Sequence, residues 1–303
     1  MNNEHTKTTI QSQAPFCSSS RHSYEGMLVR RSRIHLLGIK TLGAILALSF
    51  LGITVIVVPQ EALASSPLLT NISAYWKLDG NSTDSASTNN GTDTAITYGN
   101  AYGKINQGAL YNGTTSNINL GNVLGTVFVG AHSVSGWMYP TGGSYAELVG
   151  KTTTNTSHPI DYYANLGTSL FFIAYIGDGT SAMVAQTPNN KITLNAWNFV
   201  VVTYDGSGNR SGISIYINGV SQTLTLSGST TLTPVNGTDS TIIGSRSDAA
   251  TTLTGNMDEV GIWSRVLTSS EVTQLYNSGA GIQYPFTTAT LTSILTSWIT
   301  WIF

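Results

Sequence analysis

Two adjacent carboxylates, Asp258 and Glu259, stand in the run 255–279 close to Ile262 and Trp263. Such a pair can act in acid/base catalysis, hold a metal ion or end a strand. Retaining hydrolysis of a glycosidic bond needs two carboxyl groups about 5 Å apart. Neighbouring residues of a strand point to opposite faces. We therefore expect these two residues not to form a catalytic pair.

The remaining acids offer one alternative pair. After Ser65 the only other glutamates are Glu147 and Glu271, and the spacing of Glu271 predicts a helix cap. A glycosidase would have to assemble its carboxylates from separate strands, for example Glu147 with Asp161. The two carboxyl groups would then lie about 5 to 9.5 Å apart in an open cleft.

Other catalytic chemistries have no support. His132 and His158 lack the companions at i+2 or i+4 that a transition-metal site needs. The only cysteine, Cys17, precedes the apolar run near the N-terminus, so the later part of the chain has no disulfide framework and no thiol nucleophile. No GxSxG or GxxxxGK[ST] motif is present.

The N-terminal region has the pattern of an export signal. Basic residues precede the apolar run 41–58, and Ala62-Leu63-Ala64 has the form of a cleavage site. Residues 1–64 are therefore predicted to be a signal peptide cleaved after Ala64, or alternatively an uncleaved membrane anchor. Met27 is an alternative start. The protein is expected to be exported, either secreted or held at the cell surface.

Charge excludes one class of partner. From Ser65 onward, seven basic residues face twelve acidic ones, which gives a net charge of −5. Nothing supplies the basic stripe that neutralises phosphates, so nucleic acid is not an expected partner. Serine, threonine, asparagine and glycine are abundant instead, which suits an extracellular surface.

Short apolar runs separated by Gly, Asn, Asp and Ser clusters follow a linker at 65–70. They predict an all-β sandwich in one domain, 71–282. A chain of this size buries about 70% of its unfolded surface, enough for stability without disulfides. The predicted strands are 72–78, 108–113, 132–140, 146–151, 160–166, 169–177, 197–204, 212–217, 220–226, 241–245 and 257–263.

Two local structures are predicted in more detail. Asn218-Gly219 suits a two-residue hairpin turn with both residues at positive φ. Thr268 and Glu271 have capping-box spacing and start a helix of about three turns, with Gly279 as its left-handed C-terminal cap. The apolar tail within 283–303 has helical spacing over 287–303, which fits an interfacial helix, a last strand or a frayed end.

The blocks "AYWKLDGNSTDSASTNNGT", "HSVSGWMYPT", "AWNFVVVTYDGSGNRSGISIYINGVSQT" and "LTGNMDEVGIWSRVLTSSEVTQLYNSG" stand in the order seen in a known family. The chain resembles the laminin-G-like jellyroll domains of the concanavalin A-like lectin/glucanase superfamily over nearly all of 71–281. This resemblance implies a two-sheet antiparallel jelly-roll sandwich, with one short C-terminal helix, that binds glycans, proteins or surface polymers. An N-terminal signal or anchor helix would precede it.

The resemblance also implies a structural Ca²⁺ site. Asp258 matches an aspartate on the last long strand of the family that holds calcium together with backbone carbonyls, and Asp84 matches an aspartate of the first loop. The alternative is that both bind local backbone N–H groups. The segment from Asp79 is not an EF-hand, because position six is Asp84 and position twelve is Asn90. The Glu-x-Asp-x-(x)-Glu motif of the β-glucanases is missing.

Aromatic side chains are the usual platforms for sugars, with amides and carboxylates to read the hydroxyl groups. The candidate ligand-binding residues are Tyr139, Tyr145, Tyr162, Tyr163, Asn165, Tyr175 and Asp178. Trp76, Trp137, Trp197 and Trp263 fall in framework blocks and are expected in the core. We therefore expect a non-catalytic module for carbohydrate or another cell-surface polymer. A protein-binding adhesin or structural protein and, less favoured, a glycoside hydrolase are the alternatives.

Overall fold

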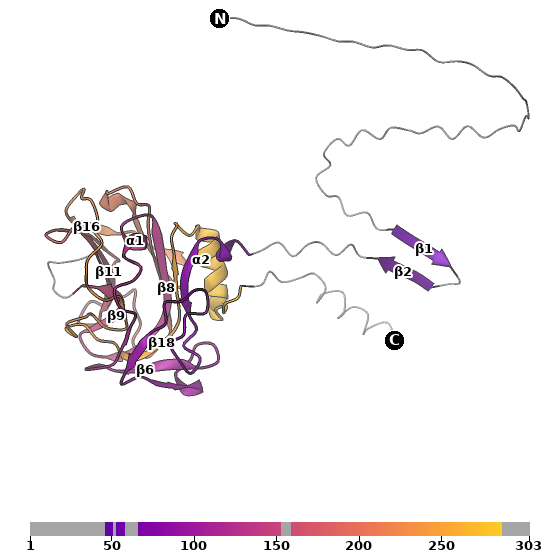
Figure 1. The fold of residues 1–303 in the computed structure, drawn as a ribbon, viewed down its shortest axis with the longest axis horizontal. Helices are drawn as coiled ribbons and strands as arrows, with labels where there is room; N and C mark the ends of the chain where they lie inside the picture. Colours follow the sequence, from indigo (N-terminus) through magenta and orange to yellow (C-terminus); the bar gives the residue numbers. More distant parts are fainter. Residues whose placement is uncertain (1–45, 51–52, 58–65, 153–158, 287–303) are drawn as a thin grey trace, which may run out of the picture. The chain divides into compact units, whose positions relative to one another are not determined.

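The computed structural model describes residues 46–50, 53–57, 66–152 and 159–286. The chain divides into two units, Met1–Gln60 and Glu61–Phe303. The second unit contains two antiparallel sheets stacked face to face (Figure 1). The predicted all-β sandwich is therefore confirmed.

The sheet that we call the front sheet has the order β16-β12-β11-β10-β9-β17-β7-β4. Its strands are β4 (Thr92–Thr94), β7 (Asn117–Asn119), β9 (Tyr145–Lys151), β10 (Ile160–Asn165), β11 (Phe171–Gly177), β12 (Ala182–Gln186), β16 (Thr225–Gly228) and β17 (Ile242–Ile243).

The other sheet, the back sheet, has the order β15-β14-β13-β8-β18-β6-β5, and β3 also pairs with β18. Its strands are β3 (Ile72–Trp76), β5 (Thr97–Gly99), β6 (Gly108–Asn112), β8 (His132–Gly142), β13 (Asn198–Tyr204), β14 (Ile213–Ile217), β15 (Val220–Ser221) and β18 (Thr254–Trp263). The predicted strand 220–226 is divided between β15 in the back sheet and β16 in the front sheet, whereas each of the other predicted strands corresponds to one strand of the structure. Strands β4, β5, β7 and β12 were not predicted.

Short helical segments connect these strands. The α-helices are α1 (Gly125–Phe128) and α2 (Ser269–Tyr276), and the 3-10 turns are η1 (Pro67–Leu69), η2 (Asn100–Tyr102), η3 (Arg210–Gly212) and η4 (Asn277–Gly279).

Apolar side chains fill the space between the sheets. Strand β13 shows the pattern most clearly, because all seven of its residues are buried. Val200 and Val202 point into the main core, while Phe199 and Val201 join a second cluster on the other face of the back sheet. The prediction that this strand is covered on both faces is confirmed.

The second cluster, which we call the outer cluster, lies beneath α2. It includes Leu68, Trp263, Leu275 and Phe286, all at most 3% exposed. Leu68 and Phe286 stand just outside the domain range 71–282 expected from the sequence, and both pack as core residues. Figure 1 places α2 on the far side of β8 and β18 from β9, β11 and β16.

The two detailed predictions are largely confirmed. Asn218 and Gly219 have φ of 51° and 79° and join β14 to β15, with Ile217 paired to Val220. Helix α2 starts with the predicted capping box of Thr268 and Glu271. It has eight residues rather than three turns, and Asn277, not Gly279, is its left-handed C-terminal cap.

The structure describes only part of the apolar run 41–58. There β1 (Leu46–Phe50) and β2 (Ile53–Val57) form an antiparallel pair. The signal or anchor helix stays a prediction, as does cleavage after Ala64. The tail 287–303 lies outside the described residues. Among the residues described, no helix is long and apolar enough to cross a bilayer.

Candidate functional site

Three of the predicted tyrosines share the outer face of the front sheet. On β10, Ile160, Tyr162 and Ala164 point into the core, so the alternating residues Asp161, Tyr163 and Asn165 point outward. The register pairs Asn165 with Tyr145 of β9 and Asp161 with Tyr175 of β11. We call Tyr145, Tyr163 and Tyr175 the tyrosine row.

The rings of this row contact one another. The centroids of Tyr163 and Tyr175 lie 6.0 Å apart with planes 12° from parallel, whereas Tyr145 meets Tyr163 edge-on at 5.5 Å and 89°. Tyr145 is 37% exposed and the other two are half-buried. Burial, and then the neighbouring Tyr175, raises the pKa of Tyr163, so its hydroxyl stays neutral at physiological pH. The row offers neutral aromatic surface with hydroxyl groups at its edge.

Two amides border the row. The Asn165 Oδ1 accepts a hydrogen bond from the Gly167 N–H at 3.1 Å, and the residue is half-buried on the same face as Tyr163. Gln186 of β12 pairs with Ile173 beside the row and is half-buried. Sequence reasoning missed Gln186, because β12 itself was not predicted.

An acid pair lies next to the row, under the loop 246–252. Glu147 is fully buried and Asp161 is 2% exposed. The Thr251 hydroxyl donates to Glu147 Oε2 at 2.8 Å, and Arg246 Nη1 lies 3.7 Å from Asp161 Oδ2. Burial, followed by the charge of Asp161, raises the pKa of Glu147 well above its ordinary value. Glu147 therefore holds a proton while Asp161 faces the guanidinium group.

This arrangement does not suit hydrolysis. A glycosidase built on Glu147 and Asp161 needs them in an open cleft. Here Arg246, Thr251 and the rest of the loop cover the two carboxyl groups, so a sugar has no access to them. The acid pair instead ties the loop 246–252 to β9 and β10.

The other predicted ligand residues lie elsewhere. Tyr162 is fully buried in the core, where its hydroxyl lies 2.7 Å from His132 Nε2, and it presents no surface to a ligand. Tyr139 is on the back sheet, packed edge-on against Trp197 at 5.5 Å. Asp178 is half-buried at the turn after β11, where its Oδ1 accepts hydrogen bonds from Thr180 and Ser181.

Three of the four framework tryptophans lie in the core, as expected. Trp76, Trp137 and Trp263 are each at most 2% exposed. Trp197 is half-buried beside Tyr139.

Asp84 anchors the first loop. Its Oδ1 accepts hydrogen bonds from the backbone N–H groups of Tyr75, Ala86 and Ser87, and its Oδ2 accepts from the backbone and side chain of Asn89, all at 2.9–3.0 Å. Five N–H donors occupy both oxygens. This set of donors suits a loop anchor rather than a calcium ligand.

A β-bulge in β18 changes the geometry of the adjacent carboxylates Asp258 and Glu259. The register shifts between Asp258 and Gly261, and Glu259 takes a left-handed φ of 52°. The expectation that neighbouring residues point to opposite faces is therefore wrong here, because the extra residue turns both carboxylates toward the same side. Both are nearly fully buried.

Each member of the pair has its own partners. Asp258 accepts hydrogen bonds from the backbone N–H groups of Lys104, Ile105 and Glu259 at 2.7–3.0 Å. Glu259 accepts from the Tyr75 hydroxyl and from Gln283, both at 2.6 Å. As with Asp84, backbone N–H donors engage the oxygens of Asp258, which does not fit a calcium ion. Within the described residues, no group of three or more His, Cys, Asp or Glu is arranged to hold a metal.

Burial shifts both carboxyl groups. It raises the pKa of Asp258 to about 9, with Glu259 as the next cause, and it raises the pKa of Glu259 to about 8. At neutral pH both carboxyl groups are therefore largely protonated. The buried pair then carries little negative charge, which keeps the free-energy cost of its burial low.

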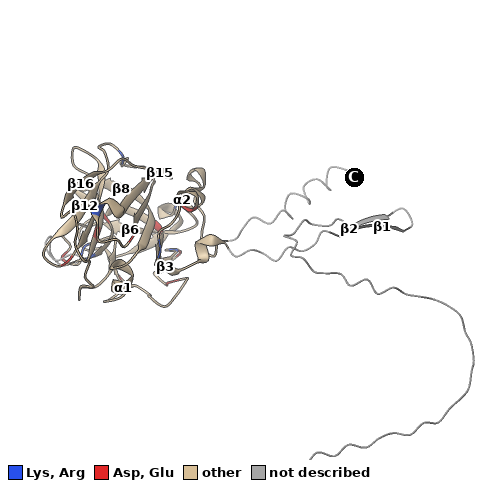
Figure 2. Cartoon of the chain, turned by 90° about the horizontal axis from the view of Figure 1, so that it is seen from above, with Lys and Arg blue, Asp and Glu red and all other residues tan. Residues whose placement is uncertain are grey.

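Charged residues are few across the whole domain, as Figure 2 shows. Two hollows, of about 780 and 580 Å³, lie away from the row. The larger is bordered by α2 and the C-terminal segment, and the smaller by the loops 206–208 and 231–234. A flat sugar chain stacks on exposed rings rather than filling a hollow, so the row remains the better candidate.

A family model of the concanavalin A-like lectin/glucanases superfamily matches residues 112–273, more than half of the chain. No curated protein matches the sequence.

Several solved structures are similar. The binding domain of Paraclostridial Mosquitocidal Protein 1 has 16% identity and a TM-score of 0.52, with 70% of this chain and 53% of that chain covered. The receptor binding domain of botulinum neurotoxin C/D mosaic serotype has 14% identity, a TM-score of 0.50, and coverages of 69% and 51%. This chain thus spans about half of each toxin chain.

A third similar structure is domain 4 of AbnA, a GH43 extracellular arabinanase from Geobacillus stearothermophilus, in complex with arabinotriose. It has 22% identity and a TM-score of 0.47, with 67% of this chain and 97% of that chain covered.

Proposed function

This chain belongs to the concanavalin A-like lectin/glucanase superfamily, and on that premise we propose that it is an exported, non-catalytic module that binds carbohydrate or a similar surface polymer. The observation that carries the proposal is the tyrosine row on the outer face of the front sheet. Its rings provide stacking surface, and the Asn165 and Gln186 amides beside them supply donors and acceptors for hydroxyl groups.

The charge around the row supports a neutral ligand. The Tyr163 hydroxyl is neutral, Glu147 holds a proton, and Asp161 faces Arg246. A polyhydroxylated neutral chain makes hydrogen bonds with such a surface without a cost for desolvating charges. That two similar structures are binding domains of larger proteins also supports a binding role.

The absence of catalysis is proposed from the burial of the acid pair. Both Glu147 and Asp161 lie beneath the loop 246–252, where Arg246 and Thr251 contact them. A bound polymer on the tyrosine row would meet rings and amides, not these carboxyl groups.

The test is retention of residues 65–303 on a panel of immobilised polysaccharides, with the supernatant analysed for released sugar. Selective retention without release is the expected result. Release of sugar would contradict the non-catalytic proposal. Failure to bind any glycan would contradict a carbohydrate ligand and favour a protein-binding adhesin.

A further inference from the structure

One lysine of the sandwich is hidden from solvent. Of the lysines that the structure describes, only Lys151, the last residue of β9, is buried, and its exposed fraction is 0%. Its Nζ lies 2.6 Å from Oδ1 of Asn122 and 2.5 Å from the backbone oxygen of Asp239. Lys151 forms no ion pair with another described residue. A buried ammonium group without such a pair is costly, so this lysine calls for an explanation.

The order of the front sheet brings the lysine and the asparagine together. Strand β17 lies between β7 and β9 and pairs with both. Just before β17, Thr241 donates from its N–H to the Gly121 carbonyl at 2.9 Å and from its hydroxyl to the Val123 carbonyl at 2.7 Å. These bonds fix the segment that carries Asn122 beside the end of β9, where Lys151 lies.

The two oxygens around Nζ match a neutral amine. An amine has two N–H groups, and the oxygens of Asn122 and Asp239 accept from both, whereas an ammonium group has three. Burial lowers the pKa of Lys151, although the negative charge of Asp239 opposes this shift. A desolvated lysine that loses its proton keeps a lone pair on Nζ and becomes a nucleophile.

The carbon atom of the Asn122 side-chain amide lies close to this nucleophile. A C=O bond is about 1.2 Å long, so Cγ of Asn122 lies at most about 3.8 Å from Nζ of Lys151. Groups that a fold holds near a separation of about 3–3.5 Å react far faster than the same groups free in solution. Asn122 itself is exposed, so a small leaving group has a path to solvent.

We propose that Nζ of Lys151 and Cγ of Asn122 join in an intramolecular isopeptide bond. The neutral amine attacks Cγ, the bond between Cγ and Nδ2 breaks, and one proton of Nζ passes to Nδ2, which leaves as ammonia. Atoms and electrons balance without an oxidant or a reductant. The contact of 2.6 Å is the precursor of this bond.

The bond braces a domain that cannot use disulfides. Cys17 is the only cysteine of the sequence, so no disulfide forms within the sandwich. The link closes residues 122–151, which include β8, into a ring. A cross-link of this kind stabilises the fold because it removes conformational entropy from the unfolded chain. The proposal does not depend on which polymer the tyrosine row binds.

The test is digestion of the denatured full chain by a protease that cuts after glutamate. Glu147 lies between the two residues, so cleavage puts Asn122 in the fragment that ends at Glu147 and Lys151 in the fragment 148–259. The two fragments should stay joined, with a mass about 17 Da below their sum because ammonia has left. A succinimide at Asn122 also loses ammonia but joins nothing. Separate fragments, from a wild type kept folded overnight beforehand, would overturn the proposal.

Three variants locate the bond. Lys151→Arg and Asn122→Ala should each abolish the joined species, because each removes one of the two reacting groups. Lys191→Arg, at an exposed lysine, should keep it. Joined fragments in Asn122→Ala, or their loss in Lys191→Arg, would contradict the assignment. The wild-type digest decides the proposal even where a variant of the buried lysine does not fold.

Discussion

The ring of Tyr163 stacks on the ring of Tyr175 at 6.0 Å, although the two residues are not direct partners across β10 and β11. Tyr163 pairs with Ile173, and Tyr175 pairs with Asp161. The contact is therefore diagonal across the two strands, with the ring planes 12° from parallel. The row is therefore an ordered surface built by the sheet rather than by a loop.

Because Glu147 is protonated and Asp161 is paired with Arg246, substitutions at the two residues should change the free energy of unfolding by different amounts. Glu147→Gln should change the free energy of unfolding by no more than about 0.5 kcal/mol, because the glutamate already carries a proton. Asp161→Asn should cost more, about 1–2 kcal/mol, because it removes one of the two carboxylates that face Arg246, while Asp248 still accepts from the guanidinium group at 2.7 Å. Urea denaturation of both variants measures this difference. Equal losses would contradict the assigned protonation.

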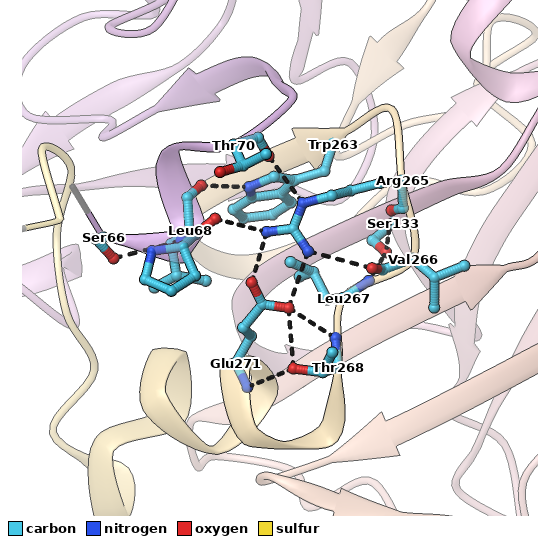
Figure 3. Close-up of polar contacts among 11 residues, drawn as sticks. Ser66, Leu68, Thr70, Ser133, Trp263, Arg265, Val266, Leu267, Thr268 and Glu271 are labelled. Atoms are coloured by element: carbon cyan, nitrogen blue, oxygen red, sulfur yellow. Dashed lines mark hydrogen bonds and ion pairs between the residues drawn. The ribbon is translucent and has the colours of Figure 1, made fainter. Parts of the chain in front are cut away.

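Arg265 donates to the carbonyls of Pro67 and Thr70 and to both oxygens of Glu271, a set of contacts that we call the arginine clamp (Figure 3). The clamp should depend strongly on the shape of the side chain at position 265. Arg265→Lys should lower the free energy of unfolding by about 2–4 kcal/mol, since lysine cannot donate to Glu271, Pro67 and Thr70 together. The half-buried Arg210, whose side chain donates to the Gly228 carbonyl, provides the control, and Arg210→Lys should cost about 0.5 kcal/mol or less. A similar loss of unfolding free energy in both variants would contradict a specific stabilising role for the clamp.

The arginine clamp should lose its stabilising effect at low pH, because Glu271 must be ionised to pair with Arg265. Burial would raise the pKa of Glu271, but hydrogen bonds from Arg265 and Thr268 outweigh it and keep the pKa below its usual value. The stabilisation is complete above the ordinary glutamate pKa and is lost as pH falls through the lowered one.

The buried carboxyl groups of Asp258 and Glu259 have the opposite effect, because they should lower the free energy of unfolding as pH rises. The folded-state pKa values of Asp258 and Glu259, about 9 and about 8, lie above those of the unfolded chain. The unfolded chain releases these protons first, so stability should fall between about pH 5 and 9, by a few kcal/mol in total. Asp79 and Lys77 also face Glu259, and the charge of Asp79 adds to this fall while that of Lys77 opposes it.

The measurement is the melting temperature across this pH range for the wild type and Glu259→Gln. The amide keeps an acceptor for the Tyr75 hydroxyl but has no proton to lose. The variant should show a flatter pH dependence. An identical slope in both proteins would contradict the raised pKa of Glu259.

Calcium dependence separates two roles of Asp258. Its three N–H donors favour a backbone anchor, so Asp258→Ala should lower the melting temperature by the same amount in calcium and in EDTA. A loss seen in calcium but almost absent in EDTA would restore the metal role that the family resemblance implies for this residue.

Much of the fold follows from local sequence. Asn218-Gly219 and the Thr268/Glu271 pair act within a few residues, and both give the structure that their pattern predicts. The long strands are equally readable, because their apolar runs are bounded by turn residues. Strands such as β4, β5 and β7 have three residues each, too few for a periodic pattern.

The site is less predictable, because it depends on distant contacts. Residue type alone offers the tyrosines as candidates, yet Tyr162 and Tyr163 differ in which face of the sheet they occupy. Nothing near Glu147 in sequence indicates that Arg246 and Thr251 will cover it. The bulge at Glu259 likewise needs a left-handed glutamate, which only the surrounding packing can enforce.

The most direct test of the binding proposal is the affinity of tyrosine variants for the glycan that the wild type retains. Tyr163→Ala and Tyr175→Ala should each weaken binding about 10- to 100-fold, because each removes a stacking ring. Tyr102→Ala, a half-buried tyrosine of η2 beside the back sheet, should bind as the wild type does. All three must first show wild-type circular dichroism. Unchanged affinity in both row variants would contradict the assignment of the tyrosine row as the binding face.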